Sequence, residues 1–125
     1  MKFCWSTLHV KSMDESLKFY EEMVGLTVTR RFSPRENLDV AFLGNGETEI
    51  ELLCDGLYPQ TDAVTRAALD TMSIGFILDL PLEAMREKLI AAGHTEMSPI
   101  LSPSPTIRFF YVHDPNGFKV QFVEG

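Results

Sequence analysis

The sequence contains few cysteines, and they form no functional motif. Among its 125 residues only Cys4 and Cys54 occur. They are about 50 positions apart, with neither the C-x-x-C spacing nor the number that a disulfide framework requires. Because a free cysteine mostly behaves as a small apolar residue, we interpret both as reduced, partly buried thiols and expect a cytoplasmic protein.

Long apolar runs and basic clusters are also missing. No run approaches the roughly 18 residues that a membrane span needs, and residues 1–6 lack the apolar stretch of a signal peptide. Eleven basic residues stand against eighteen acidic ones, which gives a net charge of −7. Nucleic acids and anionic membranes attract basic surfaces, so we expect neither as a partner.

What the chain does have is the composition of one soluble globular domain, residues 1–125. Hydrophobic residues make up 45% and charged residues 23%, which excludes disordered and fibrous classes. A domain of this length buries roughly two thirds of its unfolded surface. It therefore needs no disulfide or metal to hold a core.

The first half of the chain predicts a strand, a helix and three further strands. Ser12 and Glu15 form a capping box at the start of the helix. Apolar residues at helical spacing continue to Gly25, which suits the positive φ of a helix end. Asn45-Gly46 predicts a hairpin turn. Strands are expected at residues 3–10, 26–32, 38–43 and 48–53.

The second half predicts the same order. Pro81 suits the first turn of a helix that ends at Gly93. A proline-rich loop with Pro99, Pro103 and Pro105 follows a short strand candidate, and the D-P-N-G sequence at 114–117 predicts a tight turn. Strands are expected at residues 72–80, 94–97, 106–112 and 118–123.

The two halves are related by a nearly constant shift. Gly25 and Gly93 are 68 positions apart, and the shift grows to about 70 toward the last strands. We therefore predict an α+β fold of two tandem βαβββ modules, residues 1–54 and 72–125, that form a curved mixed sheet around a cleft. Residues 55–71 are a connector, with a helical turn expected at 63–69. Clefts between repeats commonly bind small ligands.

These motifs together resemble a known family. S-L-x-F-Y at 16–20, G-L at 25–26, I-E-L at 50–52 and D-P-N-G at 114–117 occur in the order and spacing of the glyoxalase/bleomycin-resistance/dioxygenase superfamily, or vicinal oxygen chelate fold. The resemblance covers essentially the whole chain. Within the family, the chain resembles small bacterial lactoylglutathione lyases.

The resemblance also implies where a metal would bind. In metal-using members four cleft positions supply the ligands, and here they are Trp5 and Ser73, where glyoxalases have His, Glu51, and Gln121, where the family often has Glu. An indole cannot ligate, and a hydroxyl and an amide are poor ligands for divalent zinc, nickel or iron. We therefore expect no metal and no other cofactor. If the protein does bind a metal, we expect zinc or nickel.

If the two halves align in this register, six side chains share one concave ligand-binding surface. They are Trp5, Thr7, His9, Glu51, Ser73 and Gln121. Trp5 serves either as a stacking platform or as a core residue. Glu51 is either one partner of an acid–base pair with His9 or the salt-bridge partner of Arg108 or Lys119.

The histidines and one aromatic run leave further alternatives. His9 either contacts an acidic substrate, as the family resemblance implies, or is a hydrogen-bonded residue at the cleft rim. We expect His94 in an exposed turn and His113 in a loop. Of residues 109–111 (F-F-Y), one parity must face the cleft and the other the core.

Two functions are compatible with these residues. The preferred one is a metal-free, small-molecule-binding protein resembling bleomycin-resistance proteins, and the net charge of −7 is compatible with a cationic ligand. The alternative is a lyase or isomerase resembling lactoylglutathione lyase, with an unorthodox or metal-free site and Glu51 as its catalytic residue. The resemblance also implies a homodimer.

Overall fold

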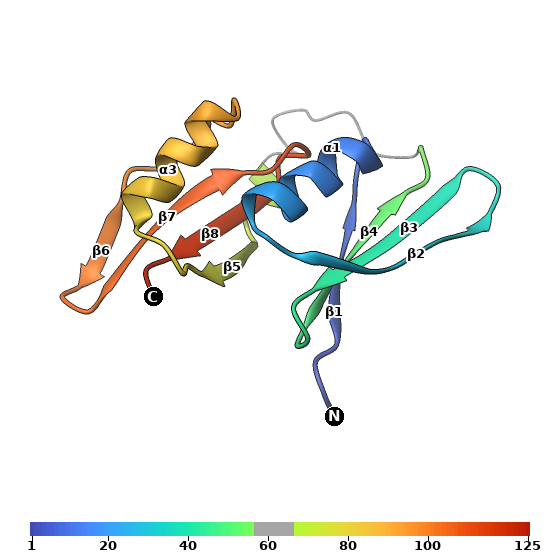
Figure 1. Ribbon diagram of the computed structural model, residues 1–125, viewed down its shortest axis with the longest axis horizontal. Coiled ribbons are helices and arrows are strands. Elements are labelled where there is room, and N and C mark those ends of the chain that lie inside the picture. Colours follow the sequence, from blue (N-terminus) through green and yellow to red (C-terminus); the bar gives the residue numbers. More distant parts are fainter. Residues whose placement is uncertain (57–66) are drawn as a thin grey trace. The chain divides into compact units, whose positions relative to one another are not determined.

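The computed structural model describes residues 1–56 and 67–125. The chain divides into two compact units, residues 1–60 and 61–125. Among the described residues each unit contains four strands with a helix between the first and the second, in the order β-α-β-β-β (Figure 1). A short helical turn at 67–69 precedes the strands of the second unit. The predicted α+β fold of two tandem modules is confirmed.

Module one forms a four-stranded mixed sheet in the order β1-β4-β3-β2. The edge strand β1 runs parallel to β4, and the remaining neighbours are antiparallel. Its elements are β1 (Trp5–His9), α1 (Met13–Lys18), η1 (Phe19–Met23), β2 (Thr27–Arg35), β3 (Leu38–Gly44) and β4 (Glu49–Cys54).

The predicted capping box marks the start of α1. Ser12 lies in extended backbone and its hydroxyl accepts a hydrogen bond from the Glu15 amide at 3.3 Å, which satisfies one of the free donors of the first turn. The helix changes to a π-helical turn at Phe19–Met23, which the apolar spacing did not predict. Gly25 follows with φ of 85°, as expected.

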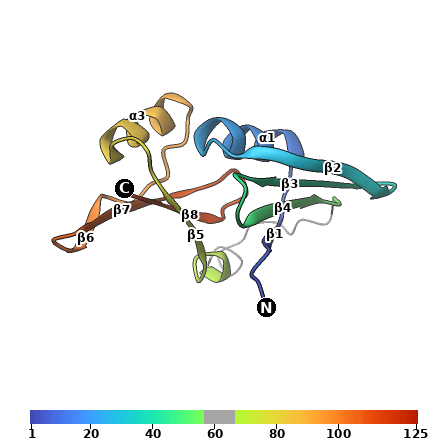
Figure 2. The ribbon, with the colours of Figure 1, turned by 60° about the horizontal axis from the view of Figure 1, so that its bottom comes forward.

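One face of the first sheet carries the core of module one. Alternate side chains on three strands are buried there: Leu8, Ala41, Leu43, Ile50 and Leu52. Figure 2 shows α1 lying along one side of the sheet, and its residues Met13 and Leu17 are buried. Because side chains alternate along a strand, the opposite face of the same strands is left without a covering helix.

Module two repeats this arrangement in the order β5-β8-β7-β6, with β5 parallel to β8. Its elements are β5 (Ser73–Ile77), α3 (Leu82–Ala91), β6 (Leu101–Ser104), β7 (Ile107–His113) and β8 (Lys119–Val123). Residues 67–69 are helical, and the rest of the helical turn predicted at 63–69 lies outside the described residues. In residues 1–56 and 67–125 no helix has both the length and the apolar character to cross a bilayer.

The expected strand at residues 94–97 is wrong. Met97 makes only an isolated bridge to Val112, and the strand forms later, as β6 within the proline-rich segment. Proline is tolerated there because β6 is the edge strand of its sheet, where Pro103 needs to donate no hydrogen bond to a further neighbour. The pairing of β6 with β7 also shifts register between Leu101 and Ser104.

The predicted tight turn between β7 and β8 is confirmed. Gly117 has φ of 91°, and its amide donates to the Asp114 carbonyl at 3.0 Å. The buried Asp114 carboxylate also accepts from the amides of Asn116 and Phe118 at 2.8 and 2.9 Å. This turn sets the register in which β8 returns along β7.

Strand registers confirm the shift between the two halves. The parallel strands pair Trp5 with Glu49 and Thr7 with Glu51 in module one, and Ser73 with Lys119 and Gly75 with Gln121 in module two. Trp5 and Ser73 therefore occupy equivalent positions, as do Glu51 and Gln121.

Both cysteines are free thiols, as expected. Cys54 is partly buried, and its thiol lies 3.7 Å from the Lys11 carbonyl oxygen. The expectation of partial burial is wrong for Cys4, which is exposed and precedes the first residue of β1.

Candidate ligand-binding faces

Each module has a sheet face that its own helix does not cover, and we call this the open face. In module one the open face carries the exposed side chains of β1 and the polar side chains of β4. The six candidate residues divide between the modules: Trp5, Thr7, His9 and Glu51 lie on the open face of module one, and Ser73 and Gln121 on that of module two. That all six share one surface stays a prediction.

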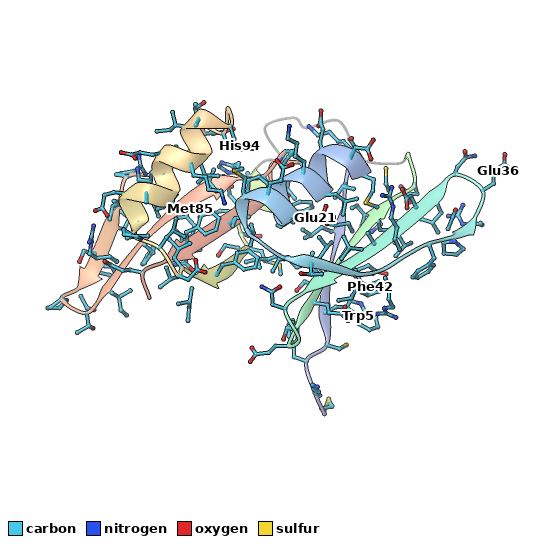
Figure 3. All side chains as sticks on the ribbon, viewed as in Figure 1. Trp5, Glu21, Glu36, Phe42, Met85 and His94 are labelled. Carbon is cyan, nitrogen blue, oxygen red and sulfur yellow. The ribbon has the colours of Figure 1, made fainter. Side chains whose placement is uncertain are left out.

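Trp5 is a surface residue of module one. Its side chain is 43% exposed, and its ring meets the ring of Phe42 edge to face, with 5.1 Å between the centroids. Figure 3 shows the two side chains next to each other. Trp5 therefore lies outside the core and presents an aromatic surface to solvent.

Phe42 is the centre of an aromatic platform that the sequence pattern did not predict. Phe32 stacks on it with 6.3 Å between ring centroids, and the Arg30 guanidinium lies 3.9 Å from its centroid. We use "aromatic platform" for Trp5, Phe32, Phe42 and Arg30. The alternation of side chains along β2 and β3 could have indicated this cluster. However, the irregular pairing between Val28 and Arg30 changes which side chains of β2 lie on the same face as Phe42.

Glu51 is half-buried and has a hydrogen-bond partner on the neighbouring strand. The Thr7 hydroxyl donates to its carboxylate at 2.6 Å, since the two residues pair directly in the β1–β4 register. His9 is exposed and pairs with Leu53 instead. Among the described residues no hydrogen bond joins His9 to Glu51, and the acid–base pairing of these two residues stays a prediction.

Glu49 adds a second carboxylate to this face. It lies two residues before Glu51 on β4, and its side chain accepts a hydrogen bond from the Thr29 hydroxyl. It also lies 3.6 Å from the Arg30 guanidinium. Glu49 therefore links the aromatic platform to the acidic part of the open face.

In module two the parity of residues 109–111 is now clear. Phe110 is fully buried in the core. Phe109 and Tyr111 lie on the open face, where their rings meet edge to face with 5.4 Å between centroids. Tyr111 pairs with Gln121 in the β7–β8 register, and the Lys119 ammonium lies 4.2 Å from the Tyr111 ring centroid.

Arg108 has carboxylate partners within module two. It donates to Glu83 at 2.6 Å and lies 3.2 Å from Glu124. The hydrogen bond from Arg108 lowers the pKa of the Glu83 carboxyl, and the same bond, with the charge of Glu124, raises the pKa of Arg108. Arg108 thus joins α3 to the end of β8, which is a structural role.

Two expectations for histidines are wrong. His113 is not in a loop, because β7 extends one residue further than predicted. Its Nε2 lies 2.8 Å from Asp70, and its Nδ1 lies 3.7 Å from Glu96. His94 is half-buried rather than exposed, and its amide donates to the Leu89 carbonyl at the end of α3.

Comparison with known proteins decides the family. Residues 3–122 match the family described as the Glyoxalase/Bleomycin resistance protein/Dioxygenase superfamily. The chain belongs to this superfamily. Over 132 aligned positions it is also 32% identical to the lactoylglutathione lyase of Haemophilus influenzae, covering 99% of this chain and 93% of that protein.

Solved structures of superfamily proteins have the same fold. The trypanothione-dependent glyoxalase I of Leishmania major aligns with a TM-score of 0.74 and 20% identity over 99% of this chain and 86% of that one. A superfamily member from Sphaerobacter thermophilus aligns with a TM-score of 0.74 and 18% identity over 100% and 98%. At these identities the similarity establishes the fold.

The four superfamily metal positions do not fit a metal in this chain. Trp5, Ser73 and Gln121 offer an indole, a hydroxyl and an amide, and only Glu51 offers a carboxylate. That carboxylate already accepts a hydrogen bond from Thr7. Within residues 1–56 and 67–125, no group of three or more His, Cys, Asp or Glu side chains could hold an ion.

Proposed function

We propose that this protein is a metal-free member of the superfamily that binds a small molecule. One observation carries the proposal: three of the four positions that supply metal ligands in the superfamily hold Trp5, Ser73 and Gln121. Divalent zinc, nickel or iron needs several imidazole, thiolate or carboxylate ligands. A single carboxylate does not replace them.

The open faces support binding rather than chemistry. Module one offers the aromatic platform beside two carboxylates, and module two offers Phe109, Tyr111, Lys119 and Gln121. Aromatic surfaces with a few polar groups are typical of small-molecule sites. The proposed ligand-binding residues remain Trp5, Thr7, His9, Glu51, Ser73 and Gln121.

The alternative is a lyase or isomerase that works without a metal. The 32% identity to a lactoylglutathione lyase favours it. Glu51 is then the candidate general base, since its carboxylate lies on the open face within reach of a polar neighbour. Thr7 would orient that carboxylate through the hydrogen bond it donates.

Metal analysis of the purified protein tests the proposal directly. Zinc, nickel, cobalt, manganese and iron should each be present far below one equivalent per chain. A stoichiometric metal that a chelator removes, with a loss of thermal stability, would overturn the proposal. The triple variant with Trp5→His, Ser73→His and Gln121→Glu rebuilds the superfamily ligand set and is expected to retain zinc or nickel.

Activity assays separate the two functions. With methylglyoxal and glutathione the protein is expected to form no lactoylglutathione. Turnover that Glu51→Gln abolishes, while Glu87→Gln at an exposed site on α3 preserves it, would establish the enzyme instead. A thermal-shift screen against antibiotics, aldehyde–thiol adducts and aromatic acids should identify a ligand that stabilises the folded protein in proportion to its occupancy.

We also propose a cytoplasmic homodimer. The superfamily resemblance supports the dimer, and two free thiols are compatible with a reducing compartment. Light scattering at micromolar concentration should give twice the chain mass of 14.1 kDa. A monomeric mass would contradict this expectation.

A further inference from the structure

Lys119 lies on the open face of module two, beside Tyr111. Its ammonium rests over the Tyr111 ring at 4.2 Å, and in the described part of the chain no carboxylate lies within ion-pair distance of it. Arg108, on the neighbouring strand, has two such partners. The contact with the ring holds Lys119 in place and leaves its N–H donors available to a ligand.

Gln121 is another polar group on this face whose side chain has no hydrogen-bond partner among the described residues. Its counterpart in module one, Glu51, is engaged by the Thr7 hydroxyl. The residue that corresponds to Thr7 is Gly75, which has no side chain. No hydrogen bond to the Gln121 side chain occurs among the described residues, so its amide remains free for a ligand.

Gly75 leaves room for the Gln121 side chain. A Cβ placed on Gly75 would lie 3.3 Å from Gln121 Oε1, a contact tight enough to move the amide by a few tenths of an ångström. The φ of Gly75 is not in the left-handed region, so the backbone does not require glycine here. The absent side chain therefore matters for the position of Gln121.

Ser73 completes a group of donors on adjacent strands. It pairs with Lys119 as Gly75 pairs with Gln121, and Ser73 is exposed. Neighbouring strands are about 4.8 Å apart, so the ammonium, the amide and the hydroxyl lie within the span of one small ligand. Tyr111 and Phe109 extend the same face with aromatic surface.

We propose that this face binds the carboxylate of a small aromatic acid, with Lys119 as the ionic partner and Gln121 as a hydrogen-bond donor. This inference rests on the proposed function and adds the chemical class of the ligand. Ammonium and amide N–H groups both donate to carboxylate oxygens. The aromatic side chains then cover the apolar body of the ligand.

The test uses three probes that share one ring system and differ in charge: 2-naphthoate, 2-naphthamide and 2-naphthylmethylammonium. Isothermal titration of the full chain should show naphthoate binding about tenfold tighter than naphthamide, and no binding of the cation, because only the carboxylate carries a charge opposite to that of Lys119. Lys119→Met should weaken naphthoate about tenfold and weaken naphthamide less, because the amide loses a hydrogen bond but no ion pair. Lys18→Met, at an exposed site on α1, removes the same charge and should change neither.

Gly75→Ala supplies a second variant that keeps every charged group. It should weaken naphthoate a few-fold because it displaces the Gln121 amide. Urea unfolding of each variant establishes that it is folded. If Lys119→Met does not fold, Lys119→Gln replaces it, with the same expected loss.

The outcomes distinguish this inference from the proposed function. Naphthoate and naphthamide binding equally, tighter binding of the cation, or naphthoate binding that Lys119→Met leaves unchanged would each overturn the inference while small-molecule binding stands. Absence of naphthoate binding would overturn it as well, and the proposed function is then judged by the thermal-shift screen.

Discussion

Removing the ring of Phe42 should weaken module one and alter the environment of Trp5. Phe42 is buried, and Phe42→Leu keeps most of its apolar volume while removing three ring contacts, those with Trp5, Phe32 and Arg30. The edge-to-face pair with Trp5 at 5.1 Å is worth about 0.5–1.5 kcal/mol. The Arg30 contact at 3.9 Å adds about 0.5–1 kcal/mol at a surface site. The stack with Phe32 at 6.3 Å adds a further contribution of about 0.5–1.5 kcal/mol. The expected loss is therefore about 1.5–4 kcal/mol.

Urea unfolding followed by fluorescence measures this loss, because Trp5 is the single tryptophan of the chain. Arg30→Met keeps the apolar stem of the side chain and removes the guanidinium. A double-mutant cycle of Phe42→Leu with Arg30→Met isolates their coupling, which we expect at about 0.5–1 kcal/mol. High salt should reduce this coupling only slightly, since the ring carries no net charge.

Phe19→Leu serves as the matched control. Phe19 is a buried phenylalanine in η1 that also makes an edge-to-face pair, with Tyr20 at 5.0 Å. Its replacement should also cost stability, but the emission maximum of folded Trp5 should not move. A coupling of zero between Phe42 and Arg30, or an unchanged Trp5 emission maximum in folded Phe42→Leu, would refute the aromatic platform.

Three further predictions concern the elements that support the faces. Ser12→Ala should lower the free energy of unfolding by about 1 kcal/mol in urea titrations, whereas Ser12→Asp retains the cap. Arg108 holds the pKa of Glu83 below its ordinary value of 4.5. The ion pair therefore contributes its full stability above pH 4.5 and loses it as the pH falls through the lower pKa of Glu83 in the folded state. In thermal melts, Arg108→Met should reduce the fall in melting temperature over this acidic pH range. An unchanged pH dependence would contradict the pairing of Arg108 with Glu83. Gly117→Ala should cost about 1–2 kcal/mol in urea titrations, because its φ is 91°; a neutral result would show that the turn relaxes.

Much of the fold follows from local sequence signals. The Ser12–Glu15 box, the positive-φ glycines at 25, 93 and 117 and the D-P-N-G turn each depend on residues close together in the chain. The shift of 68 to 70 positions related the strands of the two modules correctly. Counting residues along the chain was also enough to assign Glu51 and Gln121 to equivalent register positions.

Pairing between strands decided two features that local sequence signals left open: which segment forms β6 and how β2 aligns with β3. The segment at 94–97 and the proline-rich segment after it lie beside successive parts of β7. The first makes only the isolated Met97–Val112 bridge, and the second pairs as β6. The aromatic platform depends on an irregular register between β2 and β3, which moves Arg30 onto the face of Phe42. Neither register can be read from one strand alone.

The sequence by itself determined the repeat, the superfamily and the chemical identity of the four metal positions, since these depend on residue type and spacing. Only the folded sheets decided which partner each polar group has. Glu51 is engaged because Thr7 lies across from it. Among residues 1–56 and 67–125 the Gln121 side chain has no hydrogen-bond partner, because its cross-strand neighbour is Gly75. Cross-strand partners come from distant segments of the chain, and pairing energy between strands, rather than local preference, brings them together.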